Sequence, residues 1–170
     1  MDMPTSGITL DPAEWQIVND GVMGGMSMSR VVAAPGGGVR FEGVVSLEYG
    51  GGFASARCAC SLRTTEERAP VGGFVLRVRG DGKHYRLTIF TRSATTSARE
   101  PYHYQGKFET TGGEQEIRLP LAAFSASLRG RQVAAPPLDP HLIVALGLQI
   151  SDRQPGPFVI DLRAAGPFDA

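Results

Sequence analysis

Apolar and polar residues alternate with a period of two along several short segments of this chain, and this pattern limits the possible fold more than any other feature. Every second residue is apolar from residue 74 to 78 and again from 85 to 89. Because successive side chains of a β-strand point to opposite faces, each segment would bury one face only. The pattern therefore favours half-buried strands over helices.

A short turn separates the two clearest segments. Gly80, Asp81 and Gly82 lie between them, and such residues connect antiparallel strands tightly. The sequence thus predicts a β-hairpin in which residues 74–79 and 84–89 are neighbouring strands. Its apolar face would point to the core, and its polar face to solvent.

Similar patterns recur along the whole chain. The 22 glycines and 12 prolines of its 170 residues provide many turns, whereas helical signals are confined to Asp11–Pro12 and a turn or two at 121–128. Further strands are predicted at residues 39–47, 102–105, 108–110, 116–119, 142–151 and 158–163. We expect one all-β domain over residues 1–170, a sandwich or jelly roll of eight or nine strands with at most short helices.

The charge balance and the absence of membrane and signal-peptide patterns exclude several classes of function. Lysine plus arginine and aspartate plus glutamate number 17 each, so no overall basicity favours nucleic-acid binding. No apolar run is long enough to span a membrane, and the first ten residues lack the pattern of a signal peptide. Cys58 and Cys60 would share one face of a strand, which is poor geometry for a disulfide. We expect a cytoplasmic protein.

The first candidate site is a loop near the N-terminus. It combines the single tryptophan with residues that favour turns: Trp15, Asn19, Asp20, Gly24, Gly25 and Ser27. The loop could present an aromatic and polar rim to a ligand or partner. Alternatively, it could close one end of the sandwich, with Trp15 in the core.

The second candidate site is the polar face of the predicted hairpin. Arg77, Arg79 and Arg86 would share this face and would repel one another unless an anion met them. Such a surface would suit an acidic partner or ligand, with the hairpin residues Asp81 and Tyr85 and the nearby Tyr102 and Tyr104 included in the candidate site. Alternatively, acidic residues of the following strands would pair with the arginines: Glu109, Glu114 and Glu116.

Catalytic and cofactor motifs are missing from the sequence. It has neither a Gly-x-Ser-x-Gly elbow nor a phosphate-binding glycine loop, and no spacing marks two carboxylates as a catalytic pair. His84, His103 and His141 lack the spacings of a metal site. We therefore expect a protein that is not an enzyme and that has no cofactor.

The order of these segments resembles the complex I intermediate-associated protein 30 family. The resemblance covers residues 15–163 and departs from the family pattern at Glu114, where Trp is usual, and at Leu121, where Phe is common. It rests on Trp15, Asn19-Asp20, Gly24-Gly25-Met26-Ser27, Phe41-Glu42-Gly43, Gly51-Gly52-Phe53-Ala54-Ser55, Arg79-Gly80-Asp81-Gly82, Tyr85, Phe108, Leu119-Pro120, Phe124, Arg129-Gly130, Leu146-Gly147-Leu148-Gln149-Ile150-Ser151-Asp152 and Gly156-Pro157-Phe158.

The resemblance implies a galactose-binding-like β-sandwich, the type of jelly roll that carbohydrate-binding modules also use. Mitochondrial members of the family are assembly chaperones for respiratory complex I, and this chain is more similar to free-standing bacterial members. The resemblance implies a non-catalytic module that binds a protein partner such as an assembly intermediate. The alternative on the same fold is a module that binds a carbohydrate or another small ligand.

Overall fold

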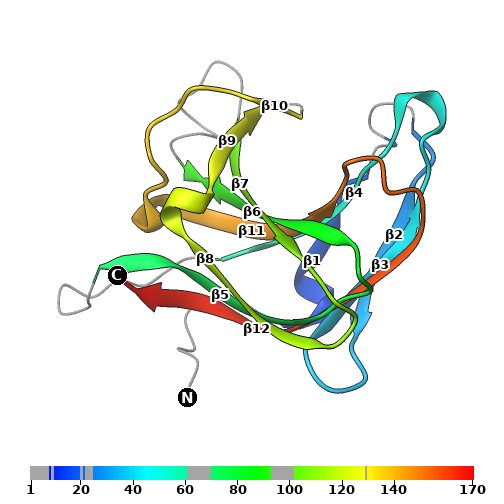
Figure 1. Ribbon diagram of the computed structural model, residues 1–170, viewed down its shortest axis with the longest axis horizontal. Helices are drawn as coiled ribbons and strands as arrows, with labels where there is room; N and C mark the ends of the chain where they lie inside the picture. Colours follow the sequence, from blue (N-terminus) through cyan, green and yellow to red (C-terminus); the bar gives the residue numbers. More distant parts are fainter. Residues whose placement is uncertain are drawn as a thin grey trace.

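A computed structural model shows two antiparallel β-sheets packed face to face (Figure 1). It describes residues 8, 10–19, 21, 25–60, 70–92, 102–128 and 130–170. The seven-stranded sheet has the order β1 (Trp15–Ile17), β4 (Ala54–Ala59), β11 (Ile143–Ile150), β6 (His84–Thr91), β7 (His103–Glu109), β9 (Ser125–Leu128) and β10 (Arg131–Gln132). The five-stranded sheet has the order β2 (Met28–Ala33), β3 (Val39–Val45), β12 (Gly156–Asp169), β5 (Val71–Arg79) and β8 (Glu114–Pro120).

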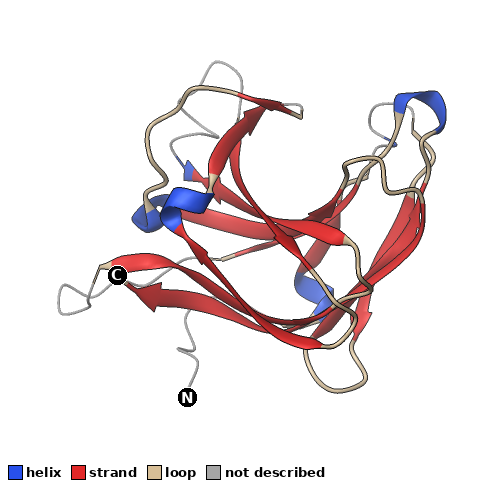
Figure 2. Cartoon of the chain, in the orientation of Figure 1, coloured by secondary structure: helices blue, strands red, loops and turns tan. Residues whose placement is uncertain are grey.

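The helical elements that lie wholly within the described residues are single 3₁₀ turns (Figure 2). These are η1 (Pro12–Glu14), η3 (Glu48–Gly50), η4 (Leu121–Ala123) and η5 (Pro140–Leu142). The Asp11 side chain caps η1 by accepting a hydrogen bond from the amide of Ala13, and Pro12 follows at the first position. No helix in the described part of the chain is long and apolar enough to cross a membrane.

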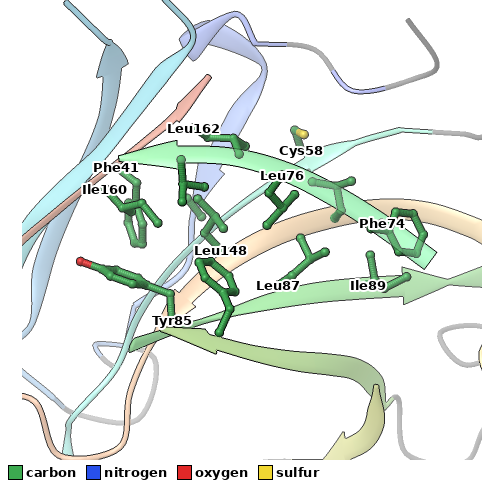
Figure 3. Close-up of a cluster of buried hydrophobic side chains, with 14 of the residues drawn as sticks. Phe41, Cys58, Phe74, Leu76, Tyr85, Leu87, Ile89, Leu148, Ile160 and Leu162 are labelled. Atoms are coloured by element: carbon green, nitrogen blue, oxygen red, sulfur yellow. The ribbon is translucent and has the colours of Figure 1, made fainter. Parts of the chain in front are cut away.

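The core lies between the sheets and is formed by the alternating apolar residues. Leu76 of β5 and Leu162 of β12 face Leu87 of β6 and Leu148 of β11 across this space (Figure 3). All four side chains are at most 1% exposed, and complete burial of a leucine contributes about 2 kcal/mol to folding. Packing between the inner faces therefore stabilises the sandwich.

The predicted fold class is confirmed, although the described residues contain more strands than the eight or nine expected. Segments 102–105 and 108–110 form the single strand β7. The additional strands are β1, β2, β4, β9 and β10. Of these, β1, β9 and β10 have two to four residues, and β4 consists mostly of small residues, so their signals are weak. The helical signal at residues 121–128, for a turn or two, corresponds to the single turn η4, and the strand β9 follows it.

The predicted hairpin is wrong. The strands β5 and β6 are consecutive in sequence but belong to different sheets, so the turn between them carries the chain across the sandwich. Asp81 holds this crossing in place: its carboxylate accepts hydrogen bonds from the amide of Lys83 at 3.1 Å, the hydroxyl of Tyr85 at 2.9 Å and the amide of Val159 at 3.0 Å. The alternation located both strands correctly but could not show which strands they pair with.

Candidate functional site

A groove of about 920 Å³ crosses the outer face of the seven-stranded sheet. Its walls come from the segment 47–53 before β4, the loop 151–153 after β11, and the end of β9 with Gly130. In Figure 1 the segment before β4 and the loop after β11 lie on the right of the view, and β9 lies on the left. The groove floor consists of outward-facing residues from five strands: Ser55, Arg57, Arg86, Thr88, Phe90, His103, Gln105, Ser127, Gly147 and Gln149.

Strand register arranges the floor in rows across the sheet. Gln149 lies opposite Ser55 on one side and Arg86 on the other. In the next row, Gly147 lies opposite both Arg57 and Thr88. Neighbouring strands are ~4.8 Å apart and rows ~7 Å apart, so side chains distant in sequence become close neighbours on this surface.

One end of the floor is a connected polar network. Arg86 donates a hydrogen bond to the Gln105 side-chain oxygen at 3.0 Å and forms an ion pair with Asp152 at 2.6 Å. Gln105 in turn donates to the side-chain oxygen of Gln149. Lys107 adds a second contact to Asp152 at 3.5 Å. These contacts fix several side chains on the floor in one arrangement.

The middle of the floor carries a cation on an aromatic ring. The guanidinium of Arg57 lies over the Phe90 ring at 5.2 Å from its centroid, and His103 packs on the same ring at 5.4 Å. Burial lowers the pKa of His103, and the nearby Arg57 charge lowers it further. His103 is therefore neutral at pH 7, and Arg57 provides the positive charge of this cluster.

The loop after β11 has an unusual backbone. Asp152 and Arg153 both have positive φ, 64° and 55°, a conformation that costs a non-glycine residue roughly 1 kcal/mol. The Gln154 side chain compensates, because it accepts a hydrogen bond from the amide of His84 and donates to the carbonyls of His84 and Ser151. This side chain ties the loop to β6 and holds Asp152 and Arg153 at the groove.

Of the residues predicted as the cationic face, Arg86 lies in the groove and the other two lie elsewhere. Arg77 and Arg79 are on β5, in the other sheet, opposite Glu116 and Glu114 of β8. The prediction that the three arginines share one surface is therefore wrong, because it depended on the hairpin. The alternative was that acidic residues of the following strands pair with these arginines, but the ion pairs that Glu114 and Glu116 form among the described residues are with Arg163 and Arg118.

The predicted aromatic residues face inward or are partly covered. The Tyr85 hydroxyl donates to Asp81, and burial raises its pKa far above the usual range. The Tyr104 hydroxyl donates to the carbonyl of Pro136 at 2.8 Å, and burial raises its pKa to about 12. Tyr102 packs edge-on against Tyr104. The alternation of β7 places His103 and Gln105, rather than Tyr104, on the groove floor.

The tryptophan loop supports one groove wall. Trp15 is buried in the core, and the Asn19 side chain accepts hydrogen bonds from the Ser29 hydroxyl at 2.8 Å and the Ser55 amide at 3.3 Å. Ser27 is bonded to the backbone of Ser46. Gly25 is half-buried, whereas Asp20 and Gly24 lie outside the described residues. The described part of this loop thus connects strands and brings Val18 to the groove.

Several groove residues were not singled out from the sequence. Arg57, Phe90, Gln105 and Asp152 come from four different elements, and no local motif joins them. Their position in the alternating pattern could have identified three of them, because Arg57, Phe90 and Gln105 each lie between two buried residues of a strand. Finding them required knowing which strands pair.

No group of three or more His, Cys, Asp or Glu side chains in the described parts of the chain could hold a metal ion. Cys58 and Cys60 are buried free thiols, and burial raises their pKa to about 11 and about 12. Both thiols are therefore protonated at neutral pH, which makes them poor nucleophiles and poor metal ligands.

Comparison with solved structures places the fold in the class of β-sandwiches that includes carbohydrate-binding modules. A family 11 carbohydrate-binding module from Clostridium thermocellum, solved in complex with a β-1,3-1,4-mixed-linked tetrasaccharide, superposes with a TM-score of 0.64 at 13% identity, covering 97% of this chain and 95% of that one. An exo-β-agarase structure gives 0.53 at 9% identity, covering 94% of this chain and 24% of that chain. At these identities the likeness concerns the fold alone.

Sequence comparison then gives the family. The model of the family described as complex I intermediate-associated protein 30 matches residues 6–162, and the chain belongs to this family. A mouse (Mus musculus) relative, mitochondrial complex I intermediate-associated protein 30, is 32% identical over 96 residues. That match covers 55% of this chain and 29% of the mouse protein, so the chain spans less than a third of this relative.

Proposed function

We propose that this chain is a non-catalytic binding module whose groove holds an extended segment of a protein partner. The observation that carries the proposal is the groove floor, where Arg86, Gln105 and Gln149 are fixed by contacts with one another and with Asp152. A preorganised surface loses little side-chain entropy when it binds a ligand. Its rows of donors and acceptors suit a ligand with regularly spaced polar groups, such as an extended peptide backbone.

Family membership supports a protein as the partner. The name of the mouse relative associates that protein with an intermediate of complex I. We extend this association to the present chain and propose that its partner is an intermediate in the assembly of such a complex. The bound segment would be one that the mature complex buries.

The chemistry of the groove supports binding without catalysis. Asp152 is the one carboxylate among the described lining residues, and Arg86 and Lys107 already pair with it. Hydrolysis by paired carboxylates needs a second acid at a defined distance. The described groove residues therefore do not provide the two free carboxylates that such hydrolysis needs.

A carbohydrate is the second candidate ligand. The solved tetrasaccharide complex of the family 11 module has the same fold, and a polar groove across a sheet could also bind hydroxyl groups. The two proposals differ in the ligand, a peptide or a carbohydrate, but both place it in the same groove. Variants of the groove therefore test both.

The test uses a blocked groove and a matched control. Gln149→Trp places an indole in the polar network of the floor, and Val44→Trp adds the same side chain to the outer face of the five-stranded sheet. Phage carrying random 12-residue peptides are selected on the wild-type protein after depletion on Gln149→Trp. Selected peptides are then synthesised, and their affinities are measured by fluorescence anisotropy.

We expect selected peptides to bind the wild type and Val44→Trp equally and Gln149→Trp at least tenfold more weakly. Circular dichroism and thermal melts confirm that both variants fold. If no peptide is enriched, or if Gln149→Trp binds the selected peptides as well as the wild type does, the proposal fails. If the mixed-linked tetrasaccharide alone shows the groove-dependent pattern, the carbohydrate candidate replaces it.

A further inference from the structure

The groove carries more positive than negative charge, although the chain as a whole is neutral. Three arginines, Arg57, Arg86 and Arg153, are among the described lining residues, against the single carboxylate of Asp152. His103 adds no charge at pH 7, because burial and Arg57 lower its pKa. The whole chain has 17 basic and 17 acidic residues, so the excess is local to the groove.

Two of these arginines have no acidic partner in the described parts of the chain. Asp152 pairs with Arg86 and Lys107, and none of the ion pairs found among the described residues involves Arg57 or Arg153. Both side chains are exposed. The contact of Arg57 with Phe90 is a cation–π contact at 5.2 Å, and no hydrogen bond or ion pair found among the described residues uses its N–H groups, which remain donors for an anion.

The positions of the two arginines match an extended ligand. Arg57 stands opposite Gly147 in the middle of the floor, and Arg153 lies six residues beyond Gly147 at one end of the groove. Six extended residues span at most ~20 Å, so the backbone positions of Gly147 and Arg153 lie within the length of an extended segment of about six residues. Carboxylates on alternate residues of such a segment lie ~7 Å apart on one face.

The aromatic residue of the floor favours a peptide over an acidic sugar. Arg57 covers one face of the Phe90 ring, and His103 packs against the same ring. This ring is therefore already occupied and is a poor platform for a sugar ring. The floor side chains Thr88, Gln105 and Gln149 can bond instead to the amides and carbonyls of a peptide backbone.

Taking the proposed function as its basis, we infer that the groove selects an acidic peptide segment, whose Asp or Glu carboxylates bind Arg57 and Arg153. The guanidinium suits this role because it presents paired N–H groups to a carboxylate. Arg86 remains committed to Asp152 and shapes the floor. The partner segment would be rich in acidic residues and extended when bound.

The test compares three labelled ten-residue peptides in which threonine alternates with Glu, Gln or Lys. Their affinities are measured by fluorescence anisotropy at low and high salt. The groove variant is Arg57→Ala with Arg153→Ala. The matched control is Arg118→Ala with Arg30→Ala, which removes the same charge from the other sheet, including an arginine that stacks on the Phe168 ring at 4.4 Å as Arg57 does on Phe90.

We expect the Glu peptide to bind the wild type and the control at least tenfold more tightly than the Gln peptide does. The groove variant should lose about tenfold in affinity for the Glu peptide, and salt should weaken the wild-type complex. Equal affinity for the Glu and Gln peptides, or equal losses in both double variants, would overturn the inference.

Two results separate this inference from the proposed function. A Gln peptide that binds the wild type as tightly as the Glu peptide, and that Gln149→Trp excludes, would leave the binding module in place while removing its acidic preference. An acidic oligosaccharide such as oligogalacturonate that binds through Arg57 and Arg153, when no peptide does, would overturn the peptide as ligand.

Discussion

The outer faces of the two sheets both carry arginines, but they use them differently. On the five-stranded sheet, Arg40 meets Asp161 through two hydrogen bonds of 2.7 and 3.0 Å, and Arg163 pairs with Glu114 at 3.0 Å. On the seven-stranded sheet, Arg57 and Arg153 line the groove without an acidic partner among the described residues. Pairing therefore distinguishes Arg40 and Arg163, which hold the fold together, from Arg57 and Arg153, which can bind a ligand.

The largest effect should come from breaking the paired face. Asp161 is 2% exposed, and Asp161→Ala would leave Arg40 and Arg163 without this carboxylate. We expect the free energy of unfolding to fall by about 3 kcal/mol, because removing one partner leaves an uncompensated charge. Urea denaturation measures this value. Arg57→Ala should change it by less than about 0.5 kcal/mol. Similar losses of unfolding free energy in Asp161→Ala and Arg57→Ala would contradict the proposed difference between the two faces.

A second variant tests a residue that belongs to neither face. Tyr85→Phe removes the hydroxyl that donates to Asp81 at the crossing between the sheets. We expect a loss of about 1.5 kcal/mol in unfolding free energy, because the hydrogen bonds of this buried hydroxyl to Asp81 and to the carbonyl of Val159 are lost. Peptide affinity should be unchanged. A large change in affinity without a change in stability would instead place Tyr85 in the binding site.

A smaller effect on stability, together with a change in peptide dissociation, is expected from the loop that contains Arg153. Gln154→Ala removes the side chain that bonds to the backbone of His84 and Ser151. We expect a net loss of about 1 kcal/mol in stability, since three hydrogen bonds disappear while the positive-φ residues relax. Affinity for the Glu peptide should fall several-fold, mainly through faster dissociation. Surface plasmon resonance measures both rates, and unchanged dissociation would contradict this prediction.

The smallest effect concerns pH. His103 has a lowered pKa in the folded protein, so the unfolded chain binds its proton first as the pH falls below about 6.5. The free energy of unfolding therefore decreases as the pH falls from the pKa of His103 in the unfolded chain to its lower pKa in the folded protein. At pH 5.5 this loss is at most about 1.4 kcal/mol relative to pH 7.5. Unfolding curves at both pH values should show a smaller difference for His103→Asn than for the wild type.

Much of the fold was predictable because the alternation of apolar and polar residues within a strand shows which of its faces is buried. The alternation at residues 74–78 and 85–89 correctly located β5, β6 and their core side chains. The turn between them was misinterpreted, because Gly80-Asp81-Gly82 is compatible with both a hairpin and a crossing. The crossing is stabilised by Val159, which lies far away in sequence. Local patterns contain no information on such a distant contact.

The site was less predictable, because its residues also meet through contacts between segments that are distant in sequence. Arg86 was identified from its position on a strand, but its partners Gln105 and Asp152 come from other elements. The sequence favoured conspicuous residues such as Trp15 and Tyr104, and the structure uses both inside the fold. Groove residues are recognisable only after strand pairing brings them together.

The strand order has a consequence for synthesis of the protein. The two strands that come last in sequence lie inside the sheets: β11 joins β4 to β6, and β12 joins β3 to β5. Until the ribosome has made them, the chain holds separate pairs and ribbons with open edges, and sequence-distant pairing of this kind is slow to form. A stop codon within β11 would therefore release a fragment lacking the middle of both sheets, which we expect to aggregate rather than form a smaller sandwich.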